Sequence, residues 1–177
     1  MNRAWNASAI PGTPGAHART VAALLTSGTY KNRRPGRSTL LGVRFETKIA
    51  VVVRDDLESW QRLNVTAFLA SGIAANPDLL GEPYADADGT RYLPLFRQPV
   101  LVLEGAKEVV TAVRERAIRR GVPTAVFTAD MFATTHDEAN RAVVAAVPAA
   151  DLDLVGVAVH GHRNAVDKIT KGAVLHR

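Results

Sequence analysis

The sequence predicts an α/β domain in which helices cover both faces of a mixed or mostly parallel sheet. The first observation is a set of four apolar runs, rich in β-branched residues, at 48–53, 99–104, 124–127 and 154–159. None of these runs alternates polar with apolar residues, and a strand of that kind is buried on both faces. The second observation is that helical segments separate the runs, an order typical of layered α/β domains.

The first strand is followed by a helix and then by a hairpin. The helix, at 60–76, carries apolar residues on nearly every face and is expected to end before Pro77, because the residue before a proline disfavours the α region. Beyond it, an Asp-Gly pair at 88–89 lies between two tyrosines, which is a signal for a tight turn. We therefore expect a small inserted hairpin near 82–96.

Three further helices are expected between and after the remaining strands. The segment 106–120 places its valines on one stripe and ends in a cationic turn before a glycine, which we read as a solvated helix end. The segment 135–147 opens with Thr135 and Glu138, a capping-box pair that would satisfy two backbone amides. A last helix is expected over about 163–171.

Charge divides the chain into two parts. Residues 1–42 hold six of the 22 basic residues and no acidic one, which leaves 16 basic and 17 acidic residues in 43–177. We expect 43–177 to be a single, nearly neutral α/β domain. We expect 1–42 to be a basic, poorly ordered tail or a translation start assigned too early; the composition also fits an organellar transit peptide. We favour the early start.

Several chemistries are excluded or disfavoured by the residues present. The sequence has no cysteine, no GxSxG elbow, no phosphate loop and no GxGxxG motif. A calcium loop starting at Asp86 fails because its twelfth position is Arg97. His160 and His162 lack a defined third ligand, so we expect no metal and no cofactor. No apolar run is long enough to cross a membrane, and a cytoplasmic protein is expected.

Five blocks of the sequence resemble a known family. They read KIAVVVRDDL, WQRLNVTAFLASGI, GEPYADADG, FTADMFATTHDEANR and LVGVAVHGHRNAVDKITKG. Together they resemble domain-of-unknown-function family 2000, which is grouped with the type II peptidyl-tRNA hydrolases, from about residue 43 to the C-terminus. The resemblance implies a three-layer fold with a four-stranded mixed sheet between helices, and a homodimer.

The sequence also departs from the hydrolases. The lysine that serves their reaction falls here near Leu63 or Asn64, neither of which can hold the charge that a lysine would. Asp130 lies near the position of a hydrolase aspartate but without the glycine that follows it there. A near-neutral domain also disfavours nucleic acid as a partner, since such binding comes largely from cationic contacts.

We therefore expect a peptidyl-tRNA hydrolase-like protein without that activity, which binds an unidentified small ligand as a small homo-oligomer. The ligand site is expected in a cleft between the first helix and the ends of the third and fourth main strands, where α/β sheets place ligands. The expected ligand-binding residues are Asn64, Thr66, Thr128 and His160.

Two alternatives stay open. In the first, the protein is an esterase on peptidyl- or aminoacyl-tRNA-like esters, in which Asp130 orients water and Lys168 or His136 acts as electrophile or base. In the second, it is a structural module whose apolar surface serves self-association only.

Overall fold

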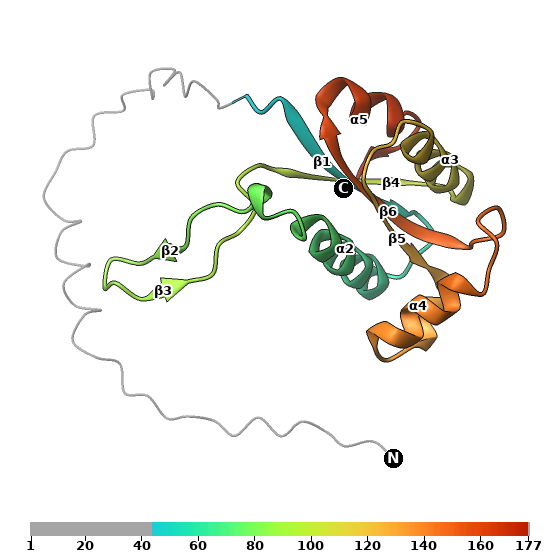
Figure 1. Ribbon diagram of the computed structural model, residues 1–177, viewed down its shortest axis with the longest axis horizontal. Helices are drawn as coiled ribbons and strands as arrows, with labels where there is room; N and C mark the ends of the chain where they lie inside the picture. The colour runs from blue at the N-terminus through green and yellow to red at the C-terminus, as the bar shows by residue number, and fades with distance from the viewer. Residues whose placement is uncertain (1–43, 177) are drawn as a thin grey trace, which may run out of the picture. The chain divides into compact units, whose positions relative to one another are not determined.

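The computed structural model describes residues 44–176, so the expectations for the N-terminal 42 residues lie outside it (Figure 1). Five strands form one sheet in the order β5-β6-β1-β4-β7. Their bounds are β1 (Thr47–Arg54), β4 (Val100–Gly105), β5 (Thr124–Thr128), β6 (Leu154–His162) and β7 (Val174–Leu175). The helices are α2 (Ser59–Ala74), α3 (Lys107–Arg119), α4 (Asp137–Ala145) and α5 (Arg163–Ile169), with 3-10 turns η1 (Pro77–Leu79) and η2 (Ala129–Ala133).

The sheet is mixed, as expected, but it has five strands rather than four. β1 and β4 are parallel, and β6 runs antiparallel to both β1 and β5. The fifth strand, β7, pairs antiparallel with the outer edge of β4. This strand was missed because it is two residues long. As a consequence of these directions, the C-terminal ends of β1, β4 and β5 lie together along one edge of the sheet, which runs across the strands. The C-terminal end of β6 lies at the opposite edge.

Helices cover both faces of the sheet, which confirms the prediction drawn from the apolar strands (Figure 1). On one face α2 packs on a core that includes Ile49, Val51 and Val53 of β1. On the other face α3 and α5 pack on a core that includes Ala50 and Val52 of the same strand. The alternation of side chains along β1 therefore divides its apolar residues between the two layers.

The helix α2 buries only one of its apolar faces. Val65, Leu69 and Ile73 face the sheet, and the first two come close to it because Gly156 of β6 has no side chain. The other large apolar residues of the helix are exposed on its outer side: Trp60, Leu63 and Phe68. A single sheet can cover only one stripe of a helix, so these three residues, on the remaining faces, stay more than half exposed.

The start of α4 differs from the prediction. The helix begins at Asp137 with His136 as its N-cap, and the expected capping box of Thr135 with Glu138 does not form. Instead, Thr135 Oγ1 lies 3.2 Å from the His136 ring atom Nδ1. The backbone is extended at Thr134 and again at His136, so the helix starts at Asp137, two residues later than expected.

The cationic end of α3 is also more than a solvated helix end. Arg116 Nη1 donates to the carbonyl oxygens of Ile169, at 3.0 Å, and Lys171, at 2.7 Å. These carbonyls lie at the C-terminus of α5, where backbone acceptors lack partners within the helix. Arg116 thus ties the two helices of that layer together.

The expected hairpin is present as β2 (Tyr84–Ala85) and β3 (Arg91–Tyr92). Its turn is organised by Asp86, which accepts the backbone N–H groups of Asp88 and Thr90 and the hydroxyl of Tyr92. The hydrogen bonds from Tyr92 and Thr90 lower the pKa of Asp86. No helix within residues 44–176 combines the length and apolarity needed to cross a bilayer.

Candidate functional site

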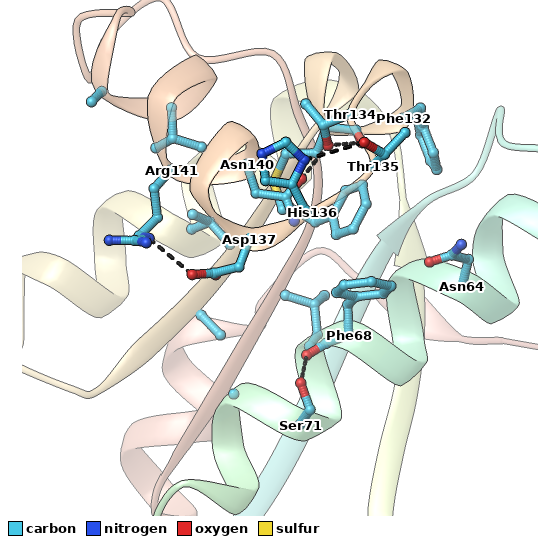
Figure 2. A pocket seen from close by; sticks show the side chains of 18 of the residues that line it. Asn64, Phe68, Ser71, Phe132, Thr134, Thr135, His136, Asp137, Asn140 and Arg141 are labelled. Carbon is cyan, nitrogen blue, oxygen red and sulfur yellow. Dashed lines mark hydrogen bonds and ion pairs between the residues drawn. The ribbon is translucent and has the colours of Figure 1, made fainter.

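A groove of about 780 Å³ lies between α2 and α4 (Figure 2). Trp60, Asn64 and Phe68 line it from α2, and His136 and Asn140 line it from the α4 side. The residues of β5, the outermost strand of the sheet on this side, form the floor of the groove, and η2 closes one end of the groove. The groove exists because α2 lies over the sheet, whereas α4, which follows β5 and η2, lies beside β5 rather than over the sheet.

Four aromatic rings form a continuous cluster along the groove. The rings of Trp60 and Phe132 lie edge to face, with centroids 5.7 Å apart, and those of Phe68 and Phe127 have the same spacing. Phe127 and Phe132 connect the two pairs at 5.1 Å. Such a cluster offers ring faces and edges to a flat apolar molecule and holds its own geometry without a ligand.

The polar rim of the groove is electrically balanced. Arg141 Nε lies 3.0 Å from Asp137 Oδ2, so the two charges compensate each other one helical turn apart (Figure 2). Thr134 donates to the carbonyl of Met131 at 2.7 Å and also contacts Asn140. The rim therefore supplies amide, hydroxyl and imidazole groups for hydrogen bonding, and its cation is already paired.

The structure places only two of the seven predicted site residues in this groove, Asn64 and His136. Thr66 lies on α2, where its hydroxyl donates to the carbonyl of Arg62 at 2.7 Å. Thr128 is 1% exposed at the end of β5 and does not line the groove. Asp130 lies on η2 with an exposed side chain, outside the lining as well.

The remaining two predicted residues lie elsewhere in the fold. His160 is near the end of β6, at the opposite edge of the sheet from Thr128, because β5 and β6 are antiparallel. Lys168 is on α5, which packs on the other face of the sheet. The expectation that these side chains meet in one cleft is therefore wrong, since it assumed that the third and fourth main strands end at the same edge.

His160 lines a second, smaller cavity of about 360 Å³. Its Nε2 atom is buried and has no hydrogen-bond partner in the described part of the chain, and desolvation lowers the pKa of the ring. Gly72 and Ala125 line both cavities and separate them. His162, two residues further on, instead caps α5 by accepting the backbone N–H of Asn164 at 3.3 Å.

Residues that line the groove but escaped the sequence analysis are the aromatic ones, Trp60, Phe68 and Phe132, together with Asn140 and Arg141. A signal for them was present in α2, which has more large apolar residues than one buried stripe needs. The prediction considered only polar residues, at strand ends and helix starts, as ligand-binding candidates and so left the aromatic residues out.

Comparison with known proteins identifies the family. Residues 47–177 match the model of the family described as "Protein of unknown function (DUF2000)". The chain belongs to this family. A solved structure of a protein of unknown function from Agrobacterium tumefaciens is 47% identical in sequence, with a TM-score of 0.73, and the match covers 76% of this chain and 100% of the other. No curated protein matches the chain. Membership of DUF2000 is thus confirmed, while the relation to the peptidyl-tRNA hydrolases stays a prediction.

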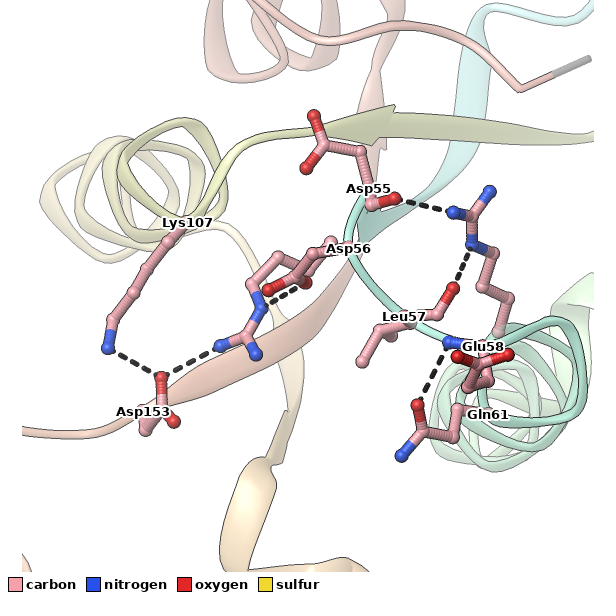
Figure 3. Close-up of polar contacts among 9 residues, drawn as sticks. Asp55, Asp56, Leu57, Glu58, Gln61, Lys107 and Asp153 are labelled. Atoms are coloured by element: carbon pink, nitrogen blue, oxygen red, sulfur yellow. Dashed lines mark hydrogen bonds and ion pairs between the residues drawn. The ribbon is translucent and has the colours of Figure 1, made fainter.

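In this DUF2000 chain, the sheet edge at which β1 and β4 end carries a network of ion pairs (Figure 3). Asp153 Oδ1 lies 2.9 Å from Arg54 Nη1 and 2.7 Å from Lys107 Nζ. Beside this group, Glu104 Oε2 lies 2.6 Å from His176 Nδ1 and 3.4 Å from Arg62 Nη1. These charged groups satisfy one another, so the network joins the loops at that edge rather than presenting free charge to a ligand.

The Asp153 contacts predict a pH dependence of stability. The hydrogen bond from Lys107, together with the charge of Arg54, lowers the pKa of Asp153 below its usual 3.8. A carboxyl whose pKa is lower in the folded state stabilises the fold above its unfolded pKa, and this stabilisation is lost as the pH falls through the folded value. Because the side chain is 39% exposed, solvent screening limits its contribution to at most about 1 kcal/mol.

Urea unfolding at neutral pH and again below pH 4 measures this contribution. We expect Asp153→Asn to lower stability at neutral pH and to reduce the loss that the wild type shows on acidification. The matched control is Asp151→Asn, two residues away, which removes the same charge from an exposed position. An equal effect of both substitutions would show that net charge, rather than the Arg54 and Lys107 contacts, is responsible.

Proposed function

We propose that this DUF2000 protein binds a small, uncharged, largely apolar molecule in the groove between α2 and α4, and that it does not cleave peptidyl-tRNA. The observation that carries the proposal is an aromatic-lined groove of about 780 Å³ with a balanced polar rim. Ligand sites typically occupy roughly 300 to 1,000 Å³ and combine apolar walls with a few polar groups.

The chemistry of the lining supports an uncharged ligand. Arg141 and Asp137 form an ion pair at the rim, so the two charges of the described lining compensate each other. A ring or fused ring system would contact Trp60, Phe68 and Phe132, while His136 and Asn140 offer hydrogen bonds to polar groups at its end.

Two features argue against hydrolysis of peptidyl-tRNA. The described lining of the groove contains no lysine, and the phosphates of a tRNA need cationic contacts. In addition, Lys168 is on α5, which packs on the other face of the sheet, so its amine does not reach a substrate in the groove. A turnover assay on N-blocked aminoacyl-tRNA tests this part, and cleavage that is abolished by Asp130→Ala would overturn it.

Ligand binding can be tested with the tryptophan in the groove. The sequence has two tryptophans, Trp5 and Trp60, so the Trp5→Phe variant leaves Trp60 as the single emitter. Titration with the neutral probe N-phenyl-1-naphthylamine is expected to transfer energy from Trp60 to the probe. The anionic probe anilinonaphthalene sulfonate should bind more weakly, because the only described cation of the lining is paired with Asp137.

Two further substitutions in the Trp5→Phe background locate the bound probe. Phe68→Ser removes a ring from the α2 wall of the groove, and Ala145→Phe narrows the groove from the α4 wall. Each substitution is expected to raise the Kd of the neutral probe at least about tenfold. The control is Ile118→Ser, which alters an exposed apolar residue on α3, on the other face of the sheet. Probe binding that is unaffected by both groove variants would contradict the proposal.

A further inference from the structure

The hairpin of β2 and β3 forms an arm, here defined as residues 81–96, that stands clear of the five-stranded sheet (Figure 1). At its base, Gly81 N–H donates to the carbonyl of Leu95 at 2.8 Å, so the two sides of the arm are already paired there. Residues 82–93 are all exposed. A two-stranded hairpin alone in water is marginally stable, so a well-formed one needs further contacts.

The arm carries large apolar side chains into solvent. Tyr84 and Tyr92 are directly opposite each other across the two strands, and hence on the same face. Leu93 and Leu95 follow them, and Leu93 is 85% exposed. Leaving these side chains in water is unfavourable, and nothing in the described part of the chain covers them.

The second exposed apolar surface is the outer strip of α2, formed by Trp60, Leu63 and Phe68. Each of them is more than half exposed, although Trp60 and Phe68 also contact rings of the groove. The strip and the four apolar residues of the arm together expose on the order of 1,000 Å² of side-chain surface. This exceeds the roughly 800 Å² that each partner contributes to a standard protein interface. Mutual burial of the two surfaces is therefore large enough for a stable dimer.

We propose that two copies of this chain exchange arms, so that the arm of each copy lies along the outer strip of α2 of the other. A two-fold arrangement buries both apolar surfaces of both copies at once and leaves none unmatched. The lengths agree as well: eight extended residues from Gly81 to the arm tip span about 26 Å, and the 16 residues of α2 span about 24 Å.

The exchange also affects the groove. Trp60 and Phe68 belong both to the outer strip and to the groove lining, so an arm seated on the strip would roof the groove with Tyr84 and Tyr92 of the partner. This second consequence rests on the proposed function, whereas the arm exchange itself does not.

Sedimentation velocity of the full chain tests the exchange. We expect a dimer for the wild type and at least about tenfold weaker dimerisation for both Leu93→Glu on the arm and Leu63→Glu on the strip, since a buried charge at either surface is unfavourable. Leu63 and Leu93 are 73% and 85% exposed, so neither charge enters the core and both variants should keep the far-UV circular dichroism spectrum of the wild type. The matched control, Ile118→Glu on α3, should remain dimeric.

Mixing the two arm-exchange variants gives the sharpest result. A heterodimer of Leu93→Glu with Leu63→Glu keeps one intact arm on one intact strip, so the mixture should form dimers at concentrations at which neither variant does alone. A monomeric wild type, a dimer insensitive to Leu93→Glu, or no recovery on mixing would each overturn the exchange. A dimer that behaves as expected but binds no neutral probe would instead contradict the proposed function and leave the exchange supported.

Discussion

Gly156→Ala is expected to lower the free energy of unfolding by about 3 kcal/mol. A Cβ atom at position 156 would lie 2.4 Å from Val65 Cγ1 and 2.9 Å from Leu69 Cδ1 of α2. Leu69 could change its side-chain conformation, but the β-branched Val65 is stiff, so the helix must move away from β6. The measurement is urea unfolding followed by far-UV circular dichroism.

The matched control for this prediction is Gly161→Ala on the same strand. There a Cβ would meet Val122 Cγ1 at 3.5 Å, which is an ordinary contact, so the same chemical change should cost far less. A double variant adds Val65→Ala, which removes the methyl group that clashes. We expect the double variant to be more stable than the sum of the two single effects predicts. Additive effects would mean that the close approach of α2 does not govern the cost.

Arg62→Met is expected to destabilise the fold by about 2 kcal/mol, the second largest effect. The guanidinium group of Arg62 donates to the carbonyl oxygens of Leu57, at 2.8 Å, and Asp55, and its Nη1 lies 3.4 Å from Glu104. Since Arg62 lies in the first turn of α2, it thereby joins this helix to the loop after β1 and to the end of β4. Methionine keeps most of the aliphatic volume and removes all three contacts.

Arg141→Met serves as the control for Arg62→Met. Arg141 is 73% exposed, and within residues 44–176 its ion pair is with Asp137 on its own helix, so its loss should cost less than about 0.5 kcal/mol. Unfolding of both variants in urea at neutral pH gives the comparison. Equal costs would show that the carbonyl contacts of Arg62 contribute little, and that the loop is held by the burial of Leu57 instead.

The role of α2 connects these expectations with the proposed binding site. Its inner face is held to the sheet by the close approach at Gly156, and its N-terminus is held by Arg62. The helix is therefore a rigid wall of the groove, and its outer side is free to present Trp60 and Phe68. A site built on a fixed helix keeps its geometry before a ligand arrives.

The sequence by itself determined the elements whose signals are local. The four main strands follow from uninterrupted apolar runs, and the hairpin from the Asp-Gly turn at 88–89. The helices follow from their apolar residues and stop signals, with ends correct to within about two residues. The covering of both sheet faces also followed, because a strand such as β1 has no polar face to leave in water.

Only the tertiary structure decided how these elements meet. The direction of β6 next to β5 carries no local signal, yet it places His160 and Thr128 at opposite edges of the sheet. Likewise, nothing local in α2 distinguishes Val65, which is buried, from Phe68, which faces the groove. Strand order and the choice of buried helix face depend on contacts between residues far apart in the chain. The pattern of apolar residues in one segment therefore predicts that an apolar face exists. The packing of the whole domain decides which neighbour covers that face and which face is left to form a groove.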